Sequence, residues 1–449
     1  MMKKLWIFVV SVVVPVTLFA QQDRTALKEV FKNEELTISL IDKGTWVVEG
    51  VDGTSMYILE GKKRAMLIDT GTKFEGLDDI VHKITAKPLD VIITHNHTDH
   101  AGNIHYFNEV YMHPADSLIA LRVPYNGKFN WLKEGDTFDL GGRIVEVYHF
   151  PGHTPGSITL VDRSINAAFT GDTFGSGLVW MQLRPHIAMT VYHESCERME
   201  KLMREQNLTK LYVGHYPHVN RILNLDYIIG MKDLAKQLSE GNTTGAKDYS
   251  NQGVSISCAK PMIASNSVTS IVFDSENIND KKEVLILLAH PDMSASKANA
   301  AMIEAVKDFT FVRVINIYEA PFTAETYTEA VREAKHIVFQ FPFYWASAPH
   351  LLKKWCDELF GALLADPGVK GKTLTVATTT GSEYEAYRAG GRNMFTIDEL
   401  LRPYQVLANH TGMAWQTPFV LYGTSLPDAD KRITAGAAAY RGKIFSMIH

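Results

Sequence analysis

The segment 94–102, with the sequence THNHTDHAG, contains three histidines and one aspartate within six consecutive positions. So many imidazole and carboxylate groups in one place would be costly to bury unless a cation neutralises and orders them. Imidazole and carboxylate together suit Zn²⁺ best, and iron and manganese also fit such a donor set. The segment therefore predicts a metal site that includes His95, His97, Asp99 and His100.

Three other segments place a histidine or an aspartate beside glycine, each after a short apolar run. They are PGHTPGS around His153, TGDT around Asp172, and YVGH, which ends at His215. Glycine has no side chain, so it lets the backbone approach a metal closely. Four strand ends that carry His, Asp and Gly in this way predict one shared metal site.

Together these segments resemble the metallo-β-lactamase fold superfamily, broadly the dinuclear zinc hydrolases such as glyoxalase II and the lactonases, over about residues 45–219. The resemblance implies two Zn²⁺ ions. Their ligands would be His95, His97 and His153 for the first ion and Asp99, His100 and His215 for the second, with Asp172 bridging the two. Asp69, in the segment LIDTG, matches the buried aspartate that supports the ligands in that superfamily.

The chemistry of such a site follows from its charges. Two cations a few ångström apart depress the pKa of a bridging water from 15.7 to around 7, which supplies a hydroxide nucleophile at neutral pH. Asp99 and Asp172 are the predicted catalytic residues, because the superfamily uses the residue matching Asp99 as ligand and proton acceptor. The lactamases proper have Cys or Ser where this chain has Asp172, which indicates esters, thioesters, lactones or phosphoesters as substrates.

Short β-rich runs alternate with helical patterns through the first half of the chain and must position these residues. Strands are expected at 46–49, 55–59, 65–69, 91–94, 144–149, 157–161, 167–170 and 210–213, and helices at 76–84 and 199–205. The alternation indicates a layered α/β domain, and the resemblance implies an αββα sandwich. Residues 174–190 are expected either to line a substrate pocket or to cover the core.

From residue 283 the pattern changes to strands that are each followed by a helix, which indicates a parallel βαβ sheet. The expected strand ends carry three groups of ligand-binding residue types. These are His290 with Ser296 and Asn299, the aromatic run Phe343, Tyr344 and Trp345, and the polar turn Thr379, Thr380 and Gly381. Open parallel sheets bind ligands at this edge.

These groups resemble the flavodoxin-like NAD(P)H:quinone reductase family, including bacterial regulators of potassium efflux, over residues 283–423. The resemblance implies a doubly wound parallel sheet, FMN or FAD as cofactor, and NAD(P)H as hydride donor to a quinone. It assigns the first group to the flavin phosphate, the aromatic run to the isoalloxazine edge and the polar turn to the polar rim of the ring. It also implies a homodimer through this half. Ser382 stands where the family has a second glycine.

Length and composition predict two folded domains, at residues 24–275 and 283–449, joined by a linker at 276–282. A net charge of -5, with no Lys/Arg cluster outside the first few residues and residues 62–64, argues against nucleic acid as a partner. Residues 1–20 predict a signal peptide, because Lys3 and Lys4 precede an apolar run that ends at Ala20. That run is shorter than the roughly 20 apolar residues a membrane span needs. We therefore expect a periplasmic or secreted protein without a membrane span after cleavage.

The leading hypothesis is a bifunctional exported enzyme: a dinuclear zinc-dependent hydrolase of small molecules, followed by a flavin-dependent NAD(P)H:quinone reductase domain. One alternative is a flavo-diiron-like reductase of dioxygen or nitric oxide, whose carboxylate-rich site needs a Glu where His97 stands. Another is a true β-lactamase with a flavin-binding module. A non-catalytic binding protein would lack some of the ligands, and the first half lacks none of them.

Overall fold

The computed structural model describes residues 27–119, 124–250, 258, 260–279 and 281–448, and divides the chain into two compact units between residues 279 and 280. We call these the first and the second unit. The expected signal peptide at 1–20 lies outside the described residues. Within the described ranges, no helix combines the length and the apolar character needed to cross a membrane.

The first unit contains three sheets. The first sheet follows chain order through β1 (Lys28–Lys32), β2 (Leu36–Asp42), β3 (Thr45–Gly50), β4 (Ser55–Glu60), β5 (Ala65–Ile68), β6 (Leu89–Ile92), β7 (Glu109–Met112) and β8 (Lys128–Trp131). The second has the order β14 (Lys210–Val213), β12 (Ala167–Gly171), β11 (Ile158–Asp162), β10 (Ile144–His149) and β9 (Thr137–Asp139). The third has the order β13 (Leu178–Trp180), β17 (Ser270–Asp274), β16 (Pro261–Ser265) and β15 (Lys247–Asp248).

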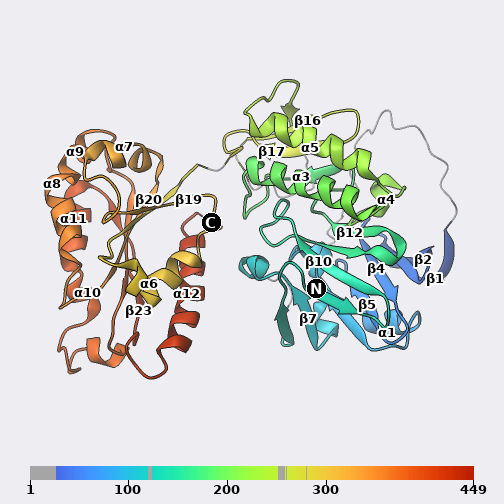
Figure 1. Cartoon of the computed structure of the whole chain (residues 1–449), viewed down its shortest axis with the longest axis horizontal. Coiled ribbons are helices and arrows are strands. Elements are labelled where there is room, and N and C mark those ends of the chain that lie inside the picture. Colours follow the sequence, from blue (N-terminus) through green and yellow to red (C-terminus); the bar gives the residue numbers. More distant parts are fainter. Residues whose placement is uncertain (1–26, 120–123, 251–257, 259, 280, 449) are drawn as a thin grey trace, which may run out of the picture. The chain divides into compact units, whose positions relative to one another are not determined.

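Helices cover the outer faces of the first two sheets (Figure 1). The helices are α1 (Leu77–His82), α2 (Thr98–Ala101), α3 (Met189–Gln206), α4 (Tyr216–Val219) and α5 (Leu225–Ser239). The described part of the unit also contains the short 3₁₀ turns η1 (Ile104–Tyr106), η2 (Pro114–Leu118) and η3 (Arg163–Ile165).

Strand β4 shows why the layers form. Its side chains alternate, so that Tyr57 and Leu59 pack toward the second sheet, whereas Met56 and Ile58 pack toward α1. Both faces are apolar because both are buried. On the far side of the second sheet, a further core cluster packs against α3 and α5. The expected αββα sandwich is therefore confirmed.

A buried arginine, paired with an aspartate of its own sheet, joins the two main sheets. Arg143, before β10, donates from Nε to Asp162 at the end of β11 at 2.6 Å, and both side chains are almost fully buried. The same guanidinium donates to Thr45 Oγ1 at 2.7 Å and to the carbonyl of Gly44, both in the β2–β3 hairpin. A buried guanidinium needs such a full set of acceptors.

The second unit is a parallel sheet in the order β19 (Val312–Asn316), β18 (Val284–Leu288), β20 (His336–Pro342), β21 (Thr373–Thr379) and β22 (Ala414–Trp415), with β23 (Phe419–Leu421) also beside β21. Numbered along the chain, this is the 2-1-3-4-5 order of flavodoxin-like sheets. The expected doubly wound parallel sheet is confirmed.

Helices cover both faces of this sheet, with α6 and α12 on one side and α8, α9 and α11 on the other (Figure 1). The helices are α6 (Lys297–Glu304), α7 (Ala324–Glu333), α8 (His350–Glu358), α9 (Phe360–Ala365), α10 (Ile397–Leu400), α11 (Arg402–Thr411) and α12 (Ala429–Phe445), with 3₁₀ turns η4 (Met293–Ala295) and η5 (Tyr384–Tyr387).

One expected helix differs clearly from the structure. The helix expected at 199–205 is the second half of α3, which begins at Met189. Its first half buries the small residues Ser195 and Cys196, which weaken the apolar periodicity there. In the second unit, α8 ends at Glu358 and α9 begins at Phe360, with Leu359 between them.

Candidate functional site

The predicted metal ligands of the first unit lie just after four strands of its two main sheets. His95, His97, Asp99 and His100 follow β6, His153 follows β10, Asp172 follows β12, and His215 follows β14. Because β6 belongs to the first sheet and the other three strands to the second, the site lies where the two sheets meet. All seven side chains come together into two adjoining groups.

The first group consists of His95, His97 and His153, whose ligand nitrogens all lie within 4.8 Å of one another. His97 Nδ1 is 2.9 Å from His153 Nε2. His95 Nε2 is buried and has no hydrogen-bond partner among the described residues. Three converging imidazole nitrogens fit a metal ion, since buried nitrogen lone pairs otherwise need donors.

The second group consists of Asp99, His100, Asp172 and His215, again within 4.8 Å of one another. Asp172 Oδ2 is 3.2 Å from His215 Nε2, and its Oδ1 is 3.6 Å from His100 Nε2. The same Oδ2 lies 3.9 Å from His153 Nε2, in the first group. The carboxylate of Asp172 thus reaches both groups, which is the place a bridging ligand must take.

Two glycines make this approach possible. A side chain at Gly214 would put its Cβ 2.3 Å from Asp172 Oδ1 and 2.6 Å from His100 Cε1. Gly171 has a φ of +49°, and a Cβ there would lie 2.3 Å from Thr94 Oγ1. Both positions must therefore be glycine for the ligands to meet.

The two groups differ in charge. Burial lowers the pKa of His97 to about 3, and it also lowers the pKa of His95 and His153. Burial acts the same way on His215, but the carboxylates of Asp172 and Asp99 outweigh it and raise its pKa to about 10. The pKa of His100 is likewise raised, since Asp69 and Asp172 outweigh burial. At neutral pH the first group is uncharged and the second consists of ion pairs.

Hydrogen bonds from the opposite ring nitrogens orient three of the histidines. His100 Nδ1 donates to Asp69 Oδ2 at 2.7 Å, His153 Nδ1 to the carbonyl of Trp180 at 2.8 Å, and His215 Nδ1 to the carbonyl of Gly53 at 3.1 Å. In each ring this leaves Nε2 for a metal. Asp69, which has the expected supporting place, also accepts from the backbone and hydroxyl of Thr94.

Residues 174–190 fulfil one of the two roles expected of them. Phe174, Val179, Met181, Ile187 and Met189 are all in the core cluster beneath α3. This segment therefore covers the core, and it contributes the Trp180 carbonyl to the metal site.

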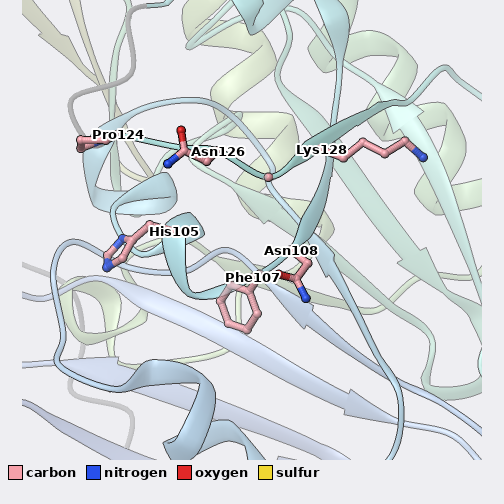
Figure 2. Close-up of a pocket in the computed structure, with 7 residues that line it drawn as sticks. His105, Phe107, Asn108, Pro124, Asn126 and Lys128 are labelled. Carbon is pink, nitrogen blue, oxygen red and sulfur yellow. The ribbon is translucent and has the colours of Figure 1, made fainter.

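A surface pocket of about 490 Å³ lies elsewhere in this unit, between η1 and the segment 124–128 (Figure 2). Its lining includes His105, Phe107, Asn126 and Lys128. None of the seven predicted ligands lines it, so the pocket gives no reason to place a substrate there.

In the second unit, the three predicted cofactor-binding segments meet at the carboxyl ends of the strands. Ser296 Oγ caps α6 by accepting from the backbone of Asn299 at 3.3 Å, and the Asn299 amide donates to Thr379 Oγ1 at 3.2 Å. Phe343 N donates to the Thr379 carbonyl at 2.9 Å. The rings of His290 and Tyr344 are 6.3 Å apart.

The outer members of these segments are open to solvent or bonded locally. Trp345 is fully exposed and has a φ of +47°. Thr380 Oγ1 donates to the carbonyl of Ser382 at 2.8 Å, and the guanidinium of Arg392 donates to Ser382 Oγ. Gly381 adjoins Ser425, whose Oγ would lie 2.8 Å from a Cβ at that position. Ser382, where the family has glycine, is thus held by an arginine.

Sequence reasoning missed a buried polar chain behind this site. Tyr440 of α12 donates to Gln340 Oε1 at 2.8 Å, and the Gln340 amide donates to Asn299 at 3.3 Å. All three side chains are buried. The one signal was a glutamine inside an otherwise apolar strand, since a buried polar residue needs partners.

Sequence reasoning also missed Asp116, in the turn η2. Its carboxylate is fully buried and accepts three hydrogen bonds, from Asn96 N, Thr154 Oγ1 and Gly156 N. Burial raises its pKa to about 6, although those three hydrogen bonds act to lower it. Because this pKa is still below 7, the carboxyl is mostly ionised at neutral pH. No motif marks this aspartate in the sequence.

Comparison with known proteins bears on both units. Residues 50–215 match the family model of the metallo-beta-lactamase superfamily, and residues 282–444 match that of the flavodoxin-like fold. General stress protein 14 of Bacillus subtilis is 38% identical over 161 residues, which cover 33% of this chain and 89% of that protein. The uncharacterized NAD(P)H oxidoreductase YdeQ of the same organism is 37% identical over 36% of this chain and 85% of its own length.

Two of the similar solved structures each match a single unit. General stress protein 14 of Treponema denticola, in complex with FMN, is 25% identical and covers 37% of this chain and 99% of its own, with a TM-score of 0.34. A metallo-beta-lactamase from Erythrobacter litoralis is 20% identical over 46% of this chain and 99% of its own, with a TM-score of 0.36.

Both resemblances expected from the sequence are confirmed by the two family models. The first unit is metallo-beta-lactamase-like, as the match over residues 50–215 shows. Because the identity to the two Bacillus proteins extends over most of their length, the second unit belongs to the flavodoxin-like family that contains them.

Proposed function

We propose that the first unit is a dinuclear metal-dependent hydrolase and the second a flavin-dependent NAD(P)H:quinone reductase. The observation that carries the first part is the carboxylate of Asp172, which lies within 3.9 Å of ligand nitrogens of both groups. The seven ligands are five imidazoles and two carboxylates. This nitrogen-rich set favours zinc over the carboxylate-rich iron site of a flavo-diiron reductase.

Two bound ions would lower the pKa of a shared water to around 7 and so supply hydroxide. The residues of the chain itself would transfer the protons. The side chain of Asp99 is 40% exposed, whereas those of His100 and Asp172 are 0% and 14% exposed. Burial raises the pKa of Asp99, but the nearby His100 and His215 outweigh it and keep the carboxyl ionised. Asp99 is therefore placed to accept the proton of the nucleophile and pass it to the leaving group.

The substrate class follows from residue 172. An aspartate there, in place of Cys or Ser, supports esters, thioesters, lactones or phosphoesters as substrates ahead of β-lactams. A panel of these five classes, assayed on one preparation of the full chain, decides between them. Turnover of a β-lactam alone would favour the β-lactamase alternative.

The Asp172→Ala variant tests the shared ligand. We expect purified protein to contain about two zinc ions per chain, and the variant to lose metal and to reduce kcat by roughly 100-fold or more, because both groups lose a carboxylate. Metal content by plasma emission and hydrolysis of the panel are the measurements. Asp233→Ala, an exposed acid on α5, is the control and should change neither. Metal-free wild-type protein, or unchanged activity in Asp172→Ala, would contradict the proposal.

The charge difference between the groups predicts how protons accompany metal binding. At pH 7 the first group should bind Zn²⁺ without releasing protons, whereas the second must release those of His100 and His215. Affinity at the second group should therefore rise as the pH rises toward 10. Titration calorimetry in two buffers of different ionisation enthalpy counts the protons. The His97→Ala variant should release as many protons on binding Zn²⁺ as the parent, and the His215→Ala variant should release fewer. The opposite result would refute the charge difference between the groups.

The proposal for the second unit is supported by its relatives and its cofactor-edge geometry. One relative is described as an NAD(P)H oxidoreductase, and one related structure contains FMN. The Ser296-capped start of α6 faces the strand ends where a flavin phosphate would bind, and the Asn299 amide joins it to Thr379. A flavin there would pass hydride from NAD(P)H to a quinone.

Replacing Asn299 tests this cofactor site. Asn299→Ala should weaken FMN binding about tenfold, since it removes the hydrogen bond that joins α6 to β21. Quenching of flavin fluorescence on titration gives the affinity. Asn409→Ala, on the exposed side of α11, should bind FMN like the parent protein. Absence of any flavin binding by the parent chain would refute the assignment.

We also propose that the enzyme is exported, on the strength of residues 1–20. Nicotinamide nucleotides are scarce outside the cytoplasm, so an exported second unit would need another electron donor. Intact mass of the protein expressed in its full length should correspond to a chain that begins at Gln21. A mass that retains residues 1–20 would refute export by this route.

A further inference from the structure

The first ligand group is assembled from two separate loops. His95 and His97 lie on the loop after β6, in the first sheet, and His153 lies on the loop after β10, in the second. We call these the β6 loop and the β10 loop. His97 Nδ1 and His153 Nε2 are only 2.9 Å apart, so a small displacement of either loop would separate the ligands. Something must fix the distance between the loops.

The buried carboxylate of Asp116 contacts both loops. Its Oδ2 accepts from the backbone N–H of Asn96, which stands between the two histidines of the β6 loop, at 2.9 Å. The same oxygen accepts from Thr154 Oγ1, next to His153, at 2.9 Å. Its Oδ1 accepts from the backbone N–H of Gly156 at 2.6 Å. One side chain thus bonds to residues adjoining all three ligands of the first group.

The residues around Asp116 reinforce this connection. The Asn96 amide donates to the carbonyl of Ile119, at the end of the same turn, at 2.8 Å. The ring of His113, which begins the turn, stacks on His149 at 3.8 Å between centroids. His149 Nε2 in turn bonds to the carbonyl of Pro155 at 2.8 Å. The turn η2 is therefore attached to both loops by several contacts.

The chemistry of the contact requires a carboxylate. Three N–H or O–H donors point at two oxygens, and an asparagine would replace one acceptor by a donor that faces another donor. The position opposite requires glycine, because a Cβ on Gly156 would lie 2.6 Å from both Cγ and Oδ1 of Asp116. The second group is held by other hydrogen bonds, from His100 to Asp69 and from His215 to the carbonyl of Gly53.

We propose that Asp116 is a positioning residue that holds the β6 and β10 loops together and so sets metal affinity at the first ligand group, with no comparable effect at the second. The inference rests on the proposed dinuclear site. Supporting groups behind metal ligands typically change metal affinity by about 10- to 100-fold when removed. We expect a change of that size, confined to the first group.

The test isolates each group in the full-length chain. The His215→Ala background leaves the first group intact, and the His97→Ala background leaves the second. Zn²⁺ affinity is measured by competition with a chromogenic chelator, with and without Asp116→Asn. The inference predicts about 10- to 100-fold weaker binding in the first background and an unchanged value in the second. Equal weakening in both, or in neither, overturns it.

A second variant decides the question if Asp116→Asn does not fold. Thr154→Val keeps the shape of the side chain and removes one of the three donors, so it should weaken the first group by roughly fivefold. Thr159→Val is its matched control, because Thr159 is also buried in this unit and its hydroxyl has no partner among the described residues. Equal affinities for Thr154→Val and Thr159→Val would overturn the inference.

The outcomes also separate this inference from the proposed function. If the parent chain binds no Zn²⁺ in the same competition assay, the dinuclear site itself is wrong and Asp116 has nothing to position. If the parent binds two ions and the Asp116 variant binds both as tightly, the dinuclear site stands and the positioning role of Asp116 is wrong.

Discussion

The first unit depends on one electrostatic constraint, the gathering of seven ionisable side chains, three of them buried, at the junction of two sheets. In the second group the charges balance one another, because the imidazoles of His100 and His215 are paired with the carboxylate of Asp172. The first group has no such compensation, since His95 and its two neighbours are uncharged and direct their nitrogens at one another. His97 Nδ1 and His153 Nε2 can share a hydrogen bond, but the buried Nε2 of His95 has no partner among the described residues, and a cation between the three rings would supply one. The surrounding fold must therefore hold that arrangement in advance.

Hydrogen bonds across the two sheets perform this task. Arg143 joins the sheets at a distance from the ligands through its bonds to Gly44 and Thr45. The backbone bond from Ile158 N to the Thr94 carbonyl, at 2.9 Å, joins them beside the β6 loop. Apolar packing between the sheets is non-directional, and it alone would tolerate small shifts. Directional bonds at the loops remove that freedom where a metal site requires ångström precision. Asp116 belongs to this set of cross-sheet contacts.

Much of this arrangement could be predicted from the sequence, because it depends on local patterns. The ligand segments were recognisable since His, Asp and Gly follow apolar runs, and the parallel sheet of the second unit was predictable from its βαβ alternation. Asp116 and Tyr440 could not be found in this way. Their partners are Asn96 and Gln340, which lie 20 and 100 residues away along the chain. Only the folded chain brings such pairs together, and neither residue stands in a pattern that marks it.

The identity of residue 172 links the geometry of the site to its chemistry. An aspartate presents two oxygens, and here Oδ1 lies 3.6 Å from His100 Nε2 while Oδ2 lies 3.2 Å from His215 Nε2 and 3.9 Å from His153 Nε2. A cysteine or serine would present a single atom on a shorter side chain and could not reach both groups in this way. Residue 214 must be glycine to leave room for this carboxylate, because a Cβ added there would lie 2.3 Å from Oδ1. Because the carboxylate lies near ligand nitrogens of both groups, Asp172 is the one side chain that two bound ions would share.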